Sequence, residues 1–577
     1  MKRRGLRALC AVGVVLTAAA CAAIPENTEL KAIPTSAGEP GRASTVDAPK
    51  GLEDPAVMVR NFVGASAKPE SSRSEARQYL VPELQKSWDD RKQLTVIDDD
   101  FATLVSSGGD SDNQTVSVRG KRIGTLGQDG DFTPDYKELD LSVPVRRSGS
   151  QWRIVTPPQE VLVTRTGMDH NYKPVRLAFL APDSPTVVRD LRYISLRPTS
   201  TLPQRTMDLL IKGPSQALRN AVRTALPGGA NLVNNVTDLT DGAVGVNLTG
   251  LADVLTETRQ LIAAQVVLSL QTVSNSRIRL LSDGVPLLPP QQDWRAGDVA
   301  KYEARTSPSP EAKDMAVVQN TVRYLLTEND GRIPGAAGSG ELSVVTASQS
   351  PTKDGPLAVV ARAGNNVNLR IGGPRELYVA ATASDLSRPT WRLDGKEVWT
   401  VVDHTSVQKF VDQGKGNWQP VRVNAEELLN KVSLVRELRL SRDGVRVAAI
   451  AANQTLWVGS VVNDGGTTSI RAVRQVGAGL LSSLVGLDWY SADTMVVAAN
   501  DPINAVYRIQ ADGQSWEKFS ATNLSPPFTA LTAAPGRPVL VTDQRGIWQS
   551  QGPDELWSQV ITSPLVNASA IVPFYPG

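Results

Sequence analysis

The stretch LRLSRDGVRVAAIAANQTLWV, from Leu438 to Val458, contains three apolar segments separated by turn residues. The dipeptide Asp443-Gly444 separates Leu438–Leu440 from Val445–Ile450, and a third segment is centred on Trp457. Short apolar runs bounded by an Asp-Gly pair are typical of antiparallel strands joined by tight turns. The stretch therefore predicts a strand, a tight turn, a second strand, another turn and a third strand.

The same pattern recurs through the C-terminal half of the chain. The marker also stands at Asp354-Gly355 and Asp394-Gly395, with degenerate forms at Ala492-Asp493 and Pro535-Gly536, so that successive markers are 40 to 49 residues apart. Further strands are expected around Trp391, Val398–Val402, Leu487–Trp489, Met495–Ala498 and Val539–Val541, and around Leu369, Tyr507 and Trp548. This period is typical of propeller blades. The 266 residues 312–577 predict an all-β propeller of five or six blades.

The first 20 residues have the features of a secretory signal peptide. The positive start is Lys2, Arg3, Arg4 and Arg7, the apolar stretch is Leu9–Leu16, and Ala18, Ala19 and Ala20 precede Cys21. A charged start, a short apolar core and small residues before the cleavage site define such signals. The apolar core is too short for a stable membrane-spanning helix. Residues 1–20 are therefore predicted to be removed by cleavage between Ala20 and Cys21.

The position of Cys21 makes this segment resemble a lipoprotein signal, although Ala18 stands where that family usually has leucine. The resemblance implies that Cys21 becomes the N-palmitoyl, S-diacylglycerol terminus of the mature chain. It places the protein on the extracytoplasmic face of the cell membrane. More than one acyl chain holds a protein stably in a membrane, whereas a single chain binds only marginally. The alternative is an ordinary signal peptide followed by an incidental cysteine. Cys10 lies in the removed segment, so the mature chain has no internal disulfide.

Residues 21–51 are rich in Pro, Ser, Thr, Gly and Ala and lack apolar periodicity, which predicts a flexible tether after the lipidated cysteine. Such a stretch spans roughly 30 Å as a random coil. Removal of four basic residues leaves 57 Lys and Arg (61 minus 4) against 59 Asp and Glu. The mature chain is therefore nearly neutral, and a nucleic-acid partner, which needs a basic face, is not expected.

Residues 52–168 are expected to form an α+β domain. Helical spacing runs over Asp54–Ala67 and again over Ser74–Leu84, continuing past Pro82. Strands are expected at Thr115–Arg119, Leu139–Val145 and Trp152–Val155. Helices followed by an antiparallel sheet that ends in a Trp-containing strand are similar to nuclear-transport-factor-like domains.

Residues 170–295 have a second α+β pattern. Strands are expected at Val175–Leu180, Leu191–Leu196, Val244–Leu248 and Ile278–Leu281, with a turn at Asp283-Gly284. Thr201 and Gln204 have capping-box spacing at the start of a helix that Gly213 and Pro214 end. A longer helix, about Thr256–Thr272, is expected to have Leu255, Ile262, Val266 and Leu270 on one apolar stripe. The segment resembles the GerM-type domain of sporulation and germination proteins, and residues 296–311 are expected to be a linker.

The order of signal peptide, lipid cysteine, tether, mixed domain, GerM-type domain and propeller resembles the LpqB family of actinobacterial lipoproteins. That resemblance covers the whole mature chain. It implies a non-enzymatic envelope protein that binds the extracellular part of a two-component sensor histidine kinase, MtrB, and modulates its signalling. A cell-wall (peptidoglycan) ligand binder is the main alternative, and a glycan hydrolase using two carboxylates is a third.

Residues suited to catalysis are few. Only His170, His404 and Cys21 could supply nitrogen or sulfur ligands to a metal, so neither a metal site nor a cofactor is expected. The chain lacks the phosphate-binding and nucleophile-elbow motifs. The acidic segment Asp129, Asp131, Asp135, Glu138 and Asp140 is expected to be a solvated loop. Recognition at the propeller rim could use Trp399, Trp418, Trp489, Trp516 and Trp557, whereas Trp457 and Trp548 are expected in the core.

Overall fold

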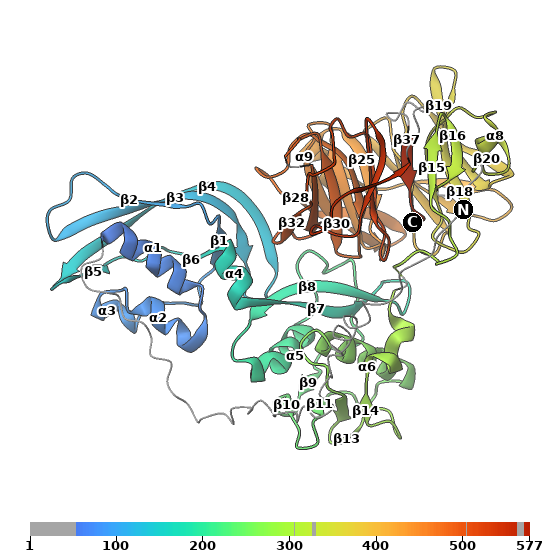
Figure 1. Ribbon diagram of the computed structural model, residues 1–577. Helices are drawn as coiled ribbons and strands as arrows, with labels where there is room; N and C mark the ends of the chain where they lie inside the picture. The colour runs from blue at the N-terminus through green and yellow to red at the C-terminus, as the bar shows by residue number, and fades with distance from the viewer. Residues whose placement is uncertain (1–53, 305, 326–330, 504, 562–570) are drawn as a thin grey trace, which may run out of the picture. The chain divides into compact units, whose positions relative to one another are not determined.

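The computed structural model describes residues 54–304, 306–325, 331–503, 505–561 and 571–577. Three modules follow one another along these residues: two that contain both helices and strands, and a third built mainly of strands (Figure 1). The predicted signal peptide and the predicted tether lie outside the described residues. Within the described part, no helix has the length and apolar character needed to cross a membrane.

The first module is built on one sheet, with strand order β5-β4-β3-β1-β6, and β2 also pairs with β3. All pairs are antiparallel except β1 with β6. Its elements are α1 (Pro55–Ser66), the 3-10 turn Glu70–Ser72, α2 (Ser74–Arg77), α3 (Pro82–Gln85), β1 (Leu94–Ile97), β2 (Ala102–Val105), β3 (Asn113–Leu126), β4 (Phe132–Ser148), β5 (Gln151–Ile154), β6 (Val161–Thr164) and α4 (Arg165–Asn171). The predicted mixed domain is confirmed.

The start of α1 follows from its sequence. The carboxylate of Asp54 accepts a hydrogen bond from the Ala56 N–H (2.8 Å), and Pro55 fits the first turn. The continuous helix predicted over Ser74–Leu84 is wrong, because α2 ends at Arg77 and α3 begins at Pro82. Val81 is extended (φ −59°, ψ 149°), since a residue before proline is disfavoured in the helical region.

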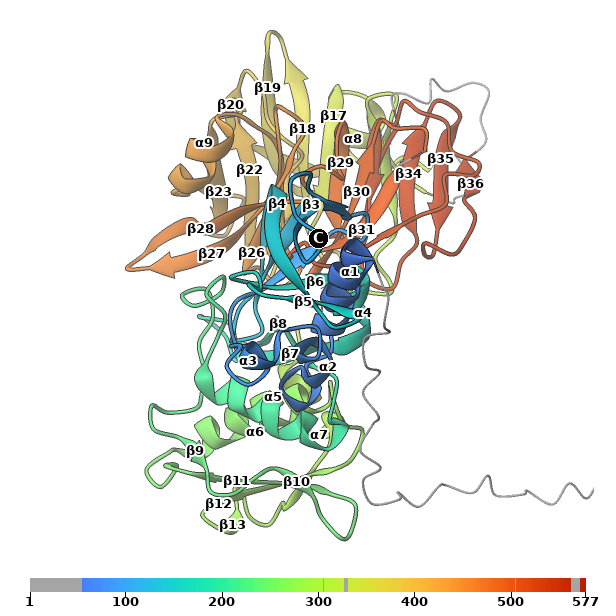
Figure 2. The ribbon, with the colours of Figure 1, turned by 90° about the vertical axis from the view of Figure 1, so that its left-hand side faces the viewer.

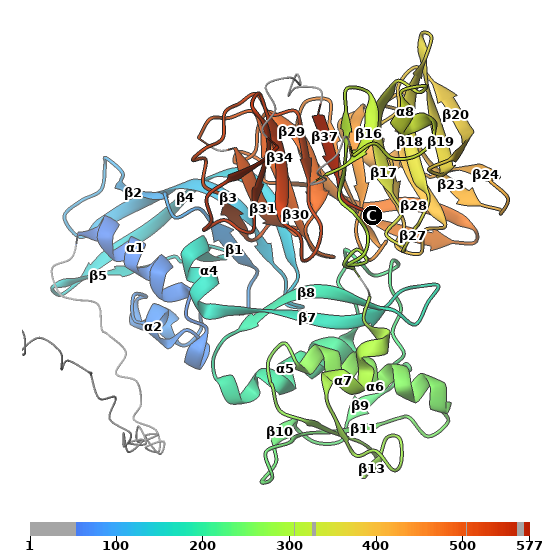
Figure 3. The same ribbon diagram turned by 45° about the vertical axis from the view of Figure 1, so that its right-hand side comes forward.

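The second module contains a β-hairpin, β7 with β8, and a separate sheet in which β11 and β12 pair in parallel. Figure 3 shows α5 and α6 beside β7. Its elements are β7 (Tyr172–Leu180), β8 (Val187–Ser195), the 3-10 turn Thr199–Thr201, α5 (Leu202–Lys212), β9 (Asn231–Leu232), β10 (Thr237–Asp238), β11 (Val244–Thr249), α6 (Thr256–Leu270), β12 (Ile278–Ser282), β13 (Val285–Pro286), β14 (Asp293–Trp294), α7 (Ala296–Val299) and the 3-10 turn Ala300–Tyr302.

Three details of the second module differ from the sequence predictions. The Thr201 hydroxyl donates to the Pro198 carbonyl (3.0 Å) rather than capping α5, so the predicted capping box is absent at this site. Leu255 precedes α6 and is 71% exposed, whereas residues 262–270 are buried all around the helix. Residues 296–302, in the predicted linker, are helical, and Val299 belongs to the core of this module.

Within the described residues the third module comprises six antiparallel sheets, five of four strands and one of three (Figure 2). The three-stranded sheet pairs the last strand with the first, β37 with β15, and so joins the two ends of the propeller. The sheets are β15 (Met315–Val318), β16 (Thr321–Tyr324) and β37 (Ile571–Phe574); β17 (Val344–Gln349), β18 (Leu357–Ala363), β19 (Asn366–Gly373) and β20 (Glu376–Ala383); β21 (Thr390–Trp391), β22 (Glu397–Val402), β23 (Ser406–Asp412) and β24 (Trp418–Arg422); β25 (Val435–Leu440), β26 (Arg446–Ala451), β27 (Leu456–Asp464) and β28 (Thr467–Val476); β29 (Leu484–Trp489), β30 (Thr494–Ala499), β31 (Val506–Gln510) and β32 (Trp516–Lys518); and β33 (Ala530–Thr532), β34 (Val539–Asp543), β35 (Gly546–Ser550) and β36 (Ser558–Ile561). Helices α8 (Ala336–Ser339) and α9 (Glu426–Val432) lie in connections.

The repeated sequence marker forms the turn between the first two strands of a sheet. At the quoted repeat, the Ser441 N–H donates to the Arg446 carbonyl (2.8 Å), and the Ser441 hydroxyl donates to Asp443. Gly444 has φ +74°, which only glycine adopts readily. Ser491 donates to Asp493 in the same way (2.9 Å) at the next marker. The predicted propeller and its repeated strands are confirmed.

Candidate functional site

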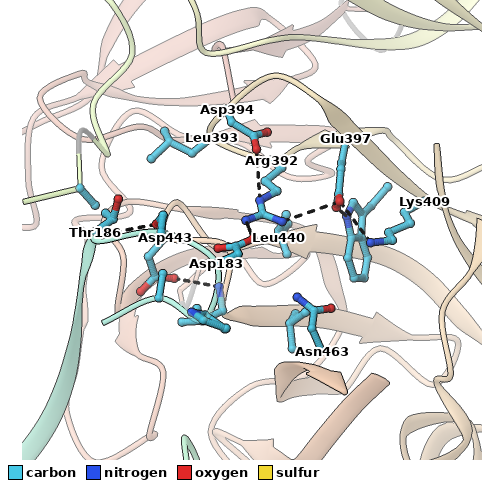
Figure 4. A pocket seen from close by; sticks show the side chains of 18 of the residues that line it. Asp183, Thr186, Arg392, Leu393, Asp394, Glu397, Lys409, Leu440, Asp443 and Asn463 are labelled. Atoms are coloured by element: carbon cyan, nitrogen blue, oxygen red, sulfur yellow. Dashed lines mark hydrogen bonds and ion pairs between the residues drawn. The ribbon is translucent and has the colours of Figure 1, made fainter. Parts of the chain in front are cut away.

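A cleft of about 500 Å³ lies where the second module meets the propeller (Figure 4). The second module contributes residues 181–186 and 301–304. The propeller contributes residues from three neighbouring segments: Arg392, Leu393, Asp394, Glu397, Trp399, Lys409, Leu440, Asp443, Gly444, Val445, Val461 and Asn463. Two marker turns, at Asp394 and Asp443, therefore stand in its wall.

Arg392 joins the two sides of this cleft. Its guanidinium bonds to the carboxylate of Asp183 in the second module and lies 3.6 Å from Asp394 and 3.7 Å from Glu397 in the propeller. Burial lowers the pKa of Arg392, but the bond to Asp183 and the neighbouring carboxylates outweigh it, so that the pKa is raised. Figure 4 shows the guanidinium between these acidic side chains.

The floor of the cleft is apolar and its polar groups already have partners. Trp399 is 2% exposed and donates its Nε1–H to Glu397 (3.3 Å), which also pairs with Lys409 at 3.1 Å. Asp443 pairs with Arg446 at 2.7 Å. Paired charges above an apolar floor are suited to recognising a charged segment, since an incoming group can exchange with an existing pair. We therefore treat the cleft as a recognition site.

The position of the cleft is fixed by a joint along β7 and β8. Arg176 Nε donates to Asp493 Oδ2 at 2.7 Å, and the Tyr193 hydroxyl lies within hydrogen-bond distance of Asp512 Oδ2 (2.9 Å) and Gln510 Oε1 (2.8 Å). Burial raises the pKa of Asp512. Burial would also raise the pKa of Asp493, but the neighbouring positive charge of Arg176 has the larger effect. The pKa of Asp493 is therefore lowered.

The first module meets the same joint. The hydroxyl of Tyr136 on β4 accepts from the Gly477 N–H of the propeller (2.8 Å), and the guanidinium of Arg165 lies 4.6 Å from the centre of the Trp516 ring. The Tyr193 N–H of β8 donates to the Gly130 carbonyl (2.7 Å). All three modules are thus bonded to one another around β8.

A second charge cluster lies at the inner edges of the propeller sheets. Asp488 accepts from Thr532 (2.8 Å) and pairs with Arg439 at 3.3 Å and Arg388 at 3.4 Å. Arg442, also buried, donates to the carbonyls of Pro576 (2.6 Å) and Ala533 (2.8 Å). Burial alone would raise the pKa of Asp488, but the three arginines lower it to about 2. Burial lowers the pKa values of Arg388 and Arg442 to about 10.

The residues singled out by sequence have mixed outcomes. Ala20 and Cys21 lie outside the described residues. His170 is exposed in α4, and His404 lies in the turn after β22, 3.5 Å from Asp385. No group of three or more His, Cys, Asp or Glu side chains among residues 54–304, 306–325, 331–503, 505–561 and 571–577 could hold a metal ion.

Two sequence predictions about this region are corrected. Asp135, Glu138 and Asp140 lie on β4 rather than in a loop, and Asp140 pairs with Arg119 at 3.1 Å. Of the expected rim residues, Trp399, Trp418, Trp489 and Trp557 are buried, because neighbouring sheets cover them. Trp516 and Trp457 are half-buried, and Trp548 is buried as predicted.

Sequence reasoning missed most of the cleft residues and the buried arginines, although Trp399, expected in recognition, and the markers at Asp394 and Asp443 do line the cleft. The marker Asp394-Gly395 predicts a turn, but nothing in the sequence around it indicates a role for its neighbour Arg392. No local signal pairs Arg392 with Asp183, since 209 residues separate them. The one sequence feature that could have drawn attention to Arg392 and Arg442 is their position in or beside marker turns.

The fold and the cleft define a multidomain protein in which a GerM-type domain is docked on a β-propeller. Residues 311–576 match the "Lipoprotein LpqB beta-propeller domain" family, residues 48–169 match "Lipoprotein LpqB, N-terminal domain", and residues 176–288 match "Sporulation and spore germination". The chain belongs to the LpqB family.

Curated relatives match over their full length. The chain is 31% identical to Lipoprotein LpqB of Nocardia farcinica, with 97% of each chain covered. It is 30% identical to Lipoprotein LpqB of Mycolicibacterium smegmatis, with 100% of each covered, and 27% identical to that of Mycobacterium tuberculosis, with 97% and 98% covered. Among solved structures, the C-terminal WD40 domain of Sif2 matches 39% of this chain and 62% of that chain, with 12% identity and a TM-score of 0.25.

Proposed function

We propose that this protein is a non-enzymatic envelope lipoprotein, anchored to the extracytoplasmic face of the cell membrane by N-palmitoyl, S-diacylglyceryl Cys21. The signal-like residues 1–20 and the name lipoprotein borne by its full-length relatives support this proposal. Residues 21–51 serve as the tether. Replacing Cys21 with alanine is expected to move the protein from the membrane fraction to the soluble fraction, and unchanged membrane retention would exclude the anchor.

The partner that we propose is the extracellular domain of a two-component sensor histidine kinase of the MtrB type, whose signalling the protein modulates. The family resemblance suggests this partner. The observation that supports a binding role is the cleft between the second module and the propeller, where Arg392 links Asp183 to Asp394 and Glu397. A cleft with exchangeable ion pairs between two modules suits recognition of a charged protein segment.

The test measures binding of the kinase extracellular domain to the mature-length chain carrying Cys21→Ser, with cross-linking to locate the contact. We expect cross-links at residues 181–186, 301–304 and 392–409, and at least about tenfold weaker binding of Arg392→Gln, the loss of one charge-assisted contact. Arg375→Gln is the matched control, because Arg375 is an exposed propeller arginine outside the cleft. Equal binding of both variants would reject the cleft as the contact.

Absence of any binding would reject the kinase as partner. If the same chain then pellets with purified peptidoglycan, the hypothesis of a cell-wall ligand replaces the hypothesis of a kinase partner. One series of samples distinguishes the two hypotheses, since both tests use the same protein.

A further inference from the structure

Three arginines gather at the turn between β4 and β5. Arg146 and Arg147 end β4 and are exposed, and Arg153 is on β5. The strand register puts Arg146 directly opposite Arg153, and Arg147 opposite Trp152. Like charges directly opposite destabilise a strand pair. None of the three makes an ion pair with a carboxylate of the described residues. The arrangement therefore needs an explanation other than stability of the hairpin.

The nearest acidic residues do not neutralise this end. Asp110 and Asp112 lie in the loop that precedes β3, and the Arg147 N–H donates to the Asp112 carbonyl (2.8 Å). The carboxylate of Asp110 is turned to its own loop, where it accepts from the N–H groups of Asp112 (2.8 Å) and Asn113 (2.5 Å). The Arg153 guanidinium donates to the Trp152 carbonyl (2.9 Å) and to the Gln151 side chain, both of which are uncharged. The positive charge of all three arginines therefore remains available to an external anion.

Apolar side chains are exposed at the same end of the sheet. Leu104 and Val105 of β2 are 50% and 41% exposed. Val105 pairs with Val116 of β3, and Asn113 of β3 pairs with Arg146, so the end of β2 lies three β3 residues from the arginines. Val57 in the first turn of α1 is also exposed, and α1 contacts both β2 and β5.

This end is also where the described chain begins. Arg60 of α1 donates to the Phe101 carbonyl just before β2. The Ser66 carbonyl, at the far end of α1, accepts from Arg73, which also donates to Tyr172 at the start of the second module. The N-terminus of α1 is therefore directed away from the second module, toward the arginines. Along β4, Arg147 is 11 residues from Tyr136, which contacts the propeller; at 3.3 Å per residue that is about 36 Å.

We infer that this end of the first module docks on anionic phospholipid headgroups. We call it the basic tip, and define it as Arg146, Arg147 and Arg153 with the exposed Val57, Leu104 and Val105. A guanidinium group can form two hydrogen bonds to one phosphate, and exposed apolar side chains can enter the boundary between headgroups and acyl chains. The inference rests on the proposed anchor in one respect, since the chain that leads to Cys21 leaves the module at this end. It would hold the second module and the propeller away from the membrane.

The test uses the mature-length chain with Cys21→Ser, so that binding cannot come from acyl chains. Co-sedimentation is measured with vesicles of phosphatidylcholine alone and with vesicles that contain about 30% phosphatidylglycerol, a proportion that gives a strongly negative surface. We expect binding to the anionic vesicles only, weakening at high salt because the contacts are screened. Arg146→Gln/Arg147→Gln/Arg153→Gln is expected to bind on the order of 100-fold more weakly, about fivefold per arginine.

The matched control is Arg219→Gln/Arg375→Gln/Arg422→Gln, which removes the same charge from exposed arginines of the other two modules. It should bind like the parent. Equal loss of binding in both triple variants would show an effect of net charge and would reject membrane docking by the basic tip. Equal binding to neutral vesicles, or no binding to any vesicles, would also reject it. A third variant, Leu104→Ser/Val105→Ser, should weaken binding without changing its salt dependence, because it removes apolar contact alone. Failure of the basic tip would leave the lipid anchor intact, since Cys21→Ala fractionation tests the anchor separately.

Discussion

Two clusters have a similar composition, in which one charge is surrounded by several of opposite sign: one lies inside the propeller, and the other lies in the cleft between the propeller and the second module. Asp488 and its arginines are buried: the side chains of Asp488, Arg439 and Arg388 are 2%, 1% and 8% exposed. In the cleft, Arg392 is 26% exposed and the carboxylates of Asp183 and Asp394 are 43% and 45% exposed. Contact with solvent thus distinguishes the two clusters more than composition does.

That difference predicts different roles. Buried charges are little screened, and loss of one partner leaves the others desolvated without compensation. Half-exposed ion pairs are screened and contribute little to stability, yet an external ligand can reach them. The Asp488 cluster therefore holds the inner strands of the propeller together, whereas the Arg392 cluster is available for binding.

The largest expected effect is that of Asp488→Asn. The amide keeps the size of the side chain but removes the carboxylate that pairs with Arg388 and Arg439, so we expect a loss of about 3 to 5 kcal/mol in the free energy of unfolding. Urea denaturation followed by tryptophan fluorescence measures it. Asp140→Asn is the control, because Asp140 is 60% exposed beside Arg119. A loss below about 1 kcal/mol, the range of surface pairs, would remove the contrast between the clusters.

The same aspartate predicts a pH dependence of stability. Its pKa is lowered from 3.8 to about 2 in the folded protein, so the folded state favours the ionised form. This contribution, about 2 kcal/mol, is fully present above pH 4 and is lost as the pH falls from about 4 to about 2. Asp488→Asn should lack this component of the acid transition. An identical pH profile in the variant and the parent would contradict the assignment.

A smaller effect is expected at the joint between the modules. Asp493→Asn weakens the bond to Arg176, whose side chain is 38% exposed and can return to water, so we expect a loss of about 1 to 2 kcal/mol. The loss should appear as a separation of the unfolding transitions of the second module and the propeller in calorimetry. Asp554→Asn is the control, because Asp554 is an exposed propeller aspartate away from this joint. A single unchanged transition in Asp493→Asn would show that other contacts hold the joint.

The sequence could predict what depends on local patterns. The marker at Asp443-Gly444 predicted its turn because the Ser441, Asp443 and Gly444 interactions lie within a few residues of one another. Residues 170–295 resembled a known domain for the same reason, since its helices and strands end at recognisable residues such as Gly213. The helix predicted to reach Leu84 ends at Arg77, because Leu80 pairs with Ile154 of the sheet and Val81 is extended before Pro82.

What could not be predicted depends on contacts between distant residues. Arg439 and Arg442 would ordinarily be placed on the surface, because arginine is seldom buried without a partner, and the partner Asp488 belongs to another sheet. The tryptophans expected at the rim are buried for a related reason, since Trp399 is covered by the following sheet and Trp489 by the preceding one, and a pattern within a single sheet does not reveal this packing. The cleft combines residues of two modules, so no single segment contains its pattern.

The smallest effect is expected for the pair Arg392 and Asp183, and it tests the contrast most directly. A double-mutant cycle with Arg392→Gln and Asp183→Asn should give a coupling free energy of about 0.5 kcal/mol at low salt, since the pair is half-exposed. The coupling should disappear at about 0.5 M salt, where the Debye length is only a few ångströms. By the same cycle, Arg439 with Asp488 should keep its coupling at both salt concentrations. A salt-resistant coupling above about 2 kcal/mol for Arg392 and Asp183 would show that solvent does not reach the cleft, and the cleft would then be a structural joint like the propeller interior rather than a binding site.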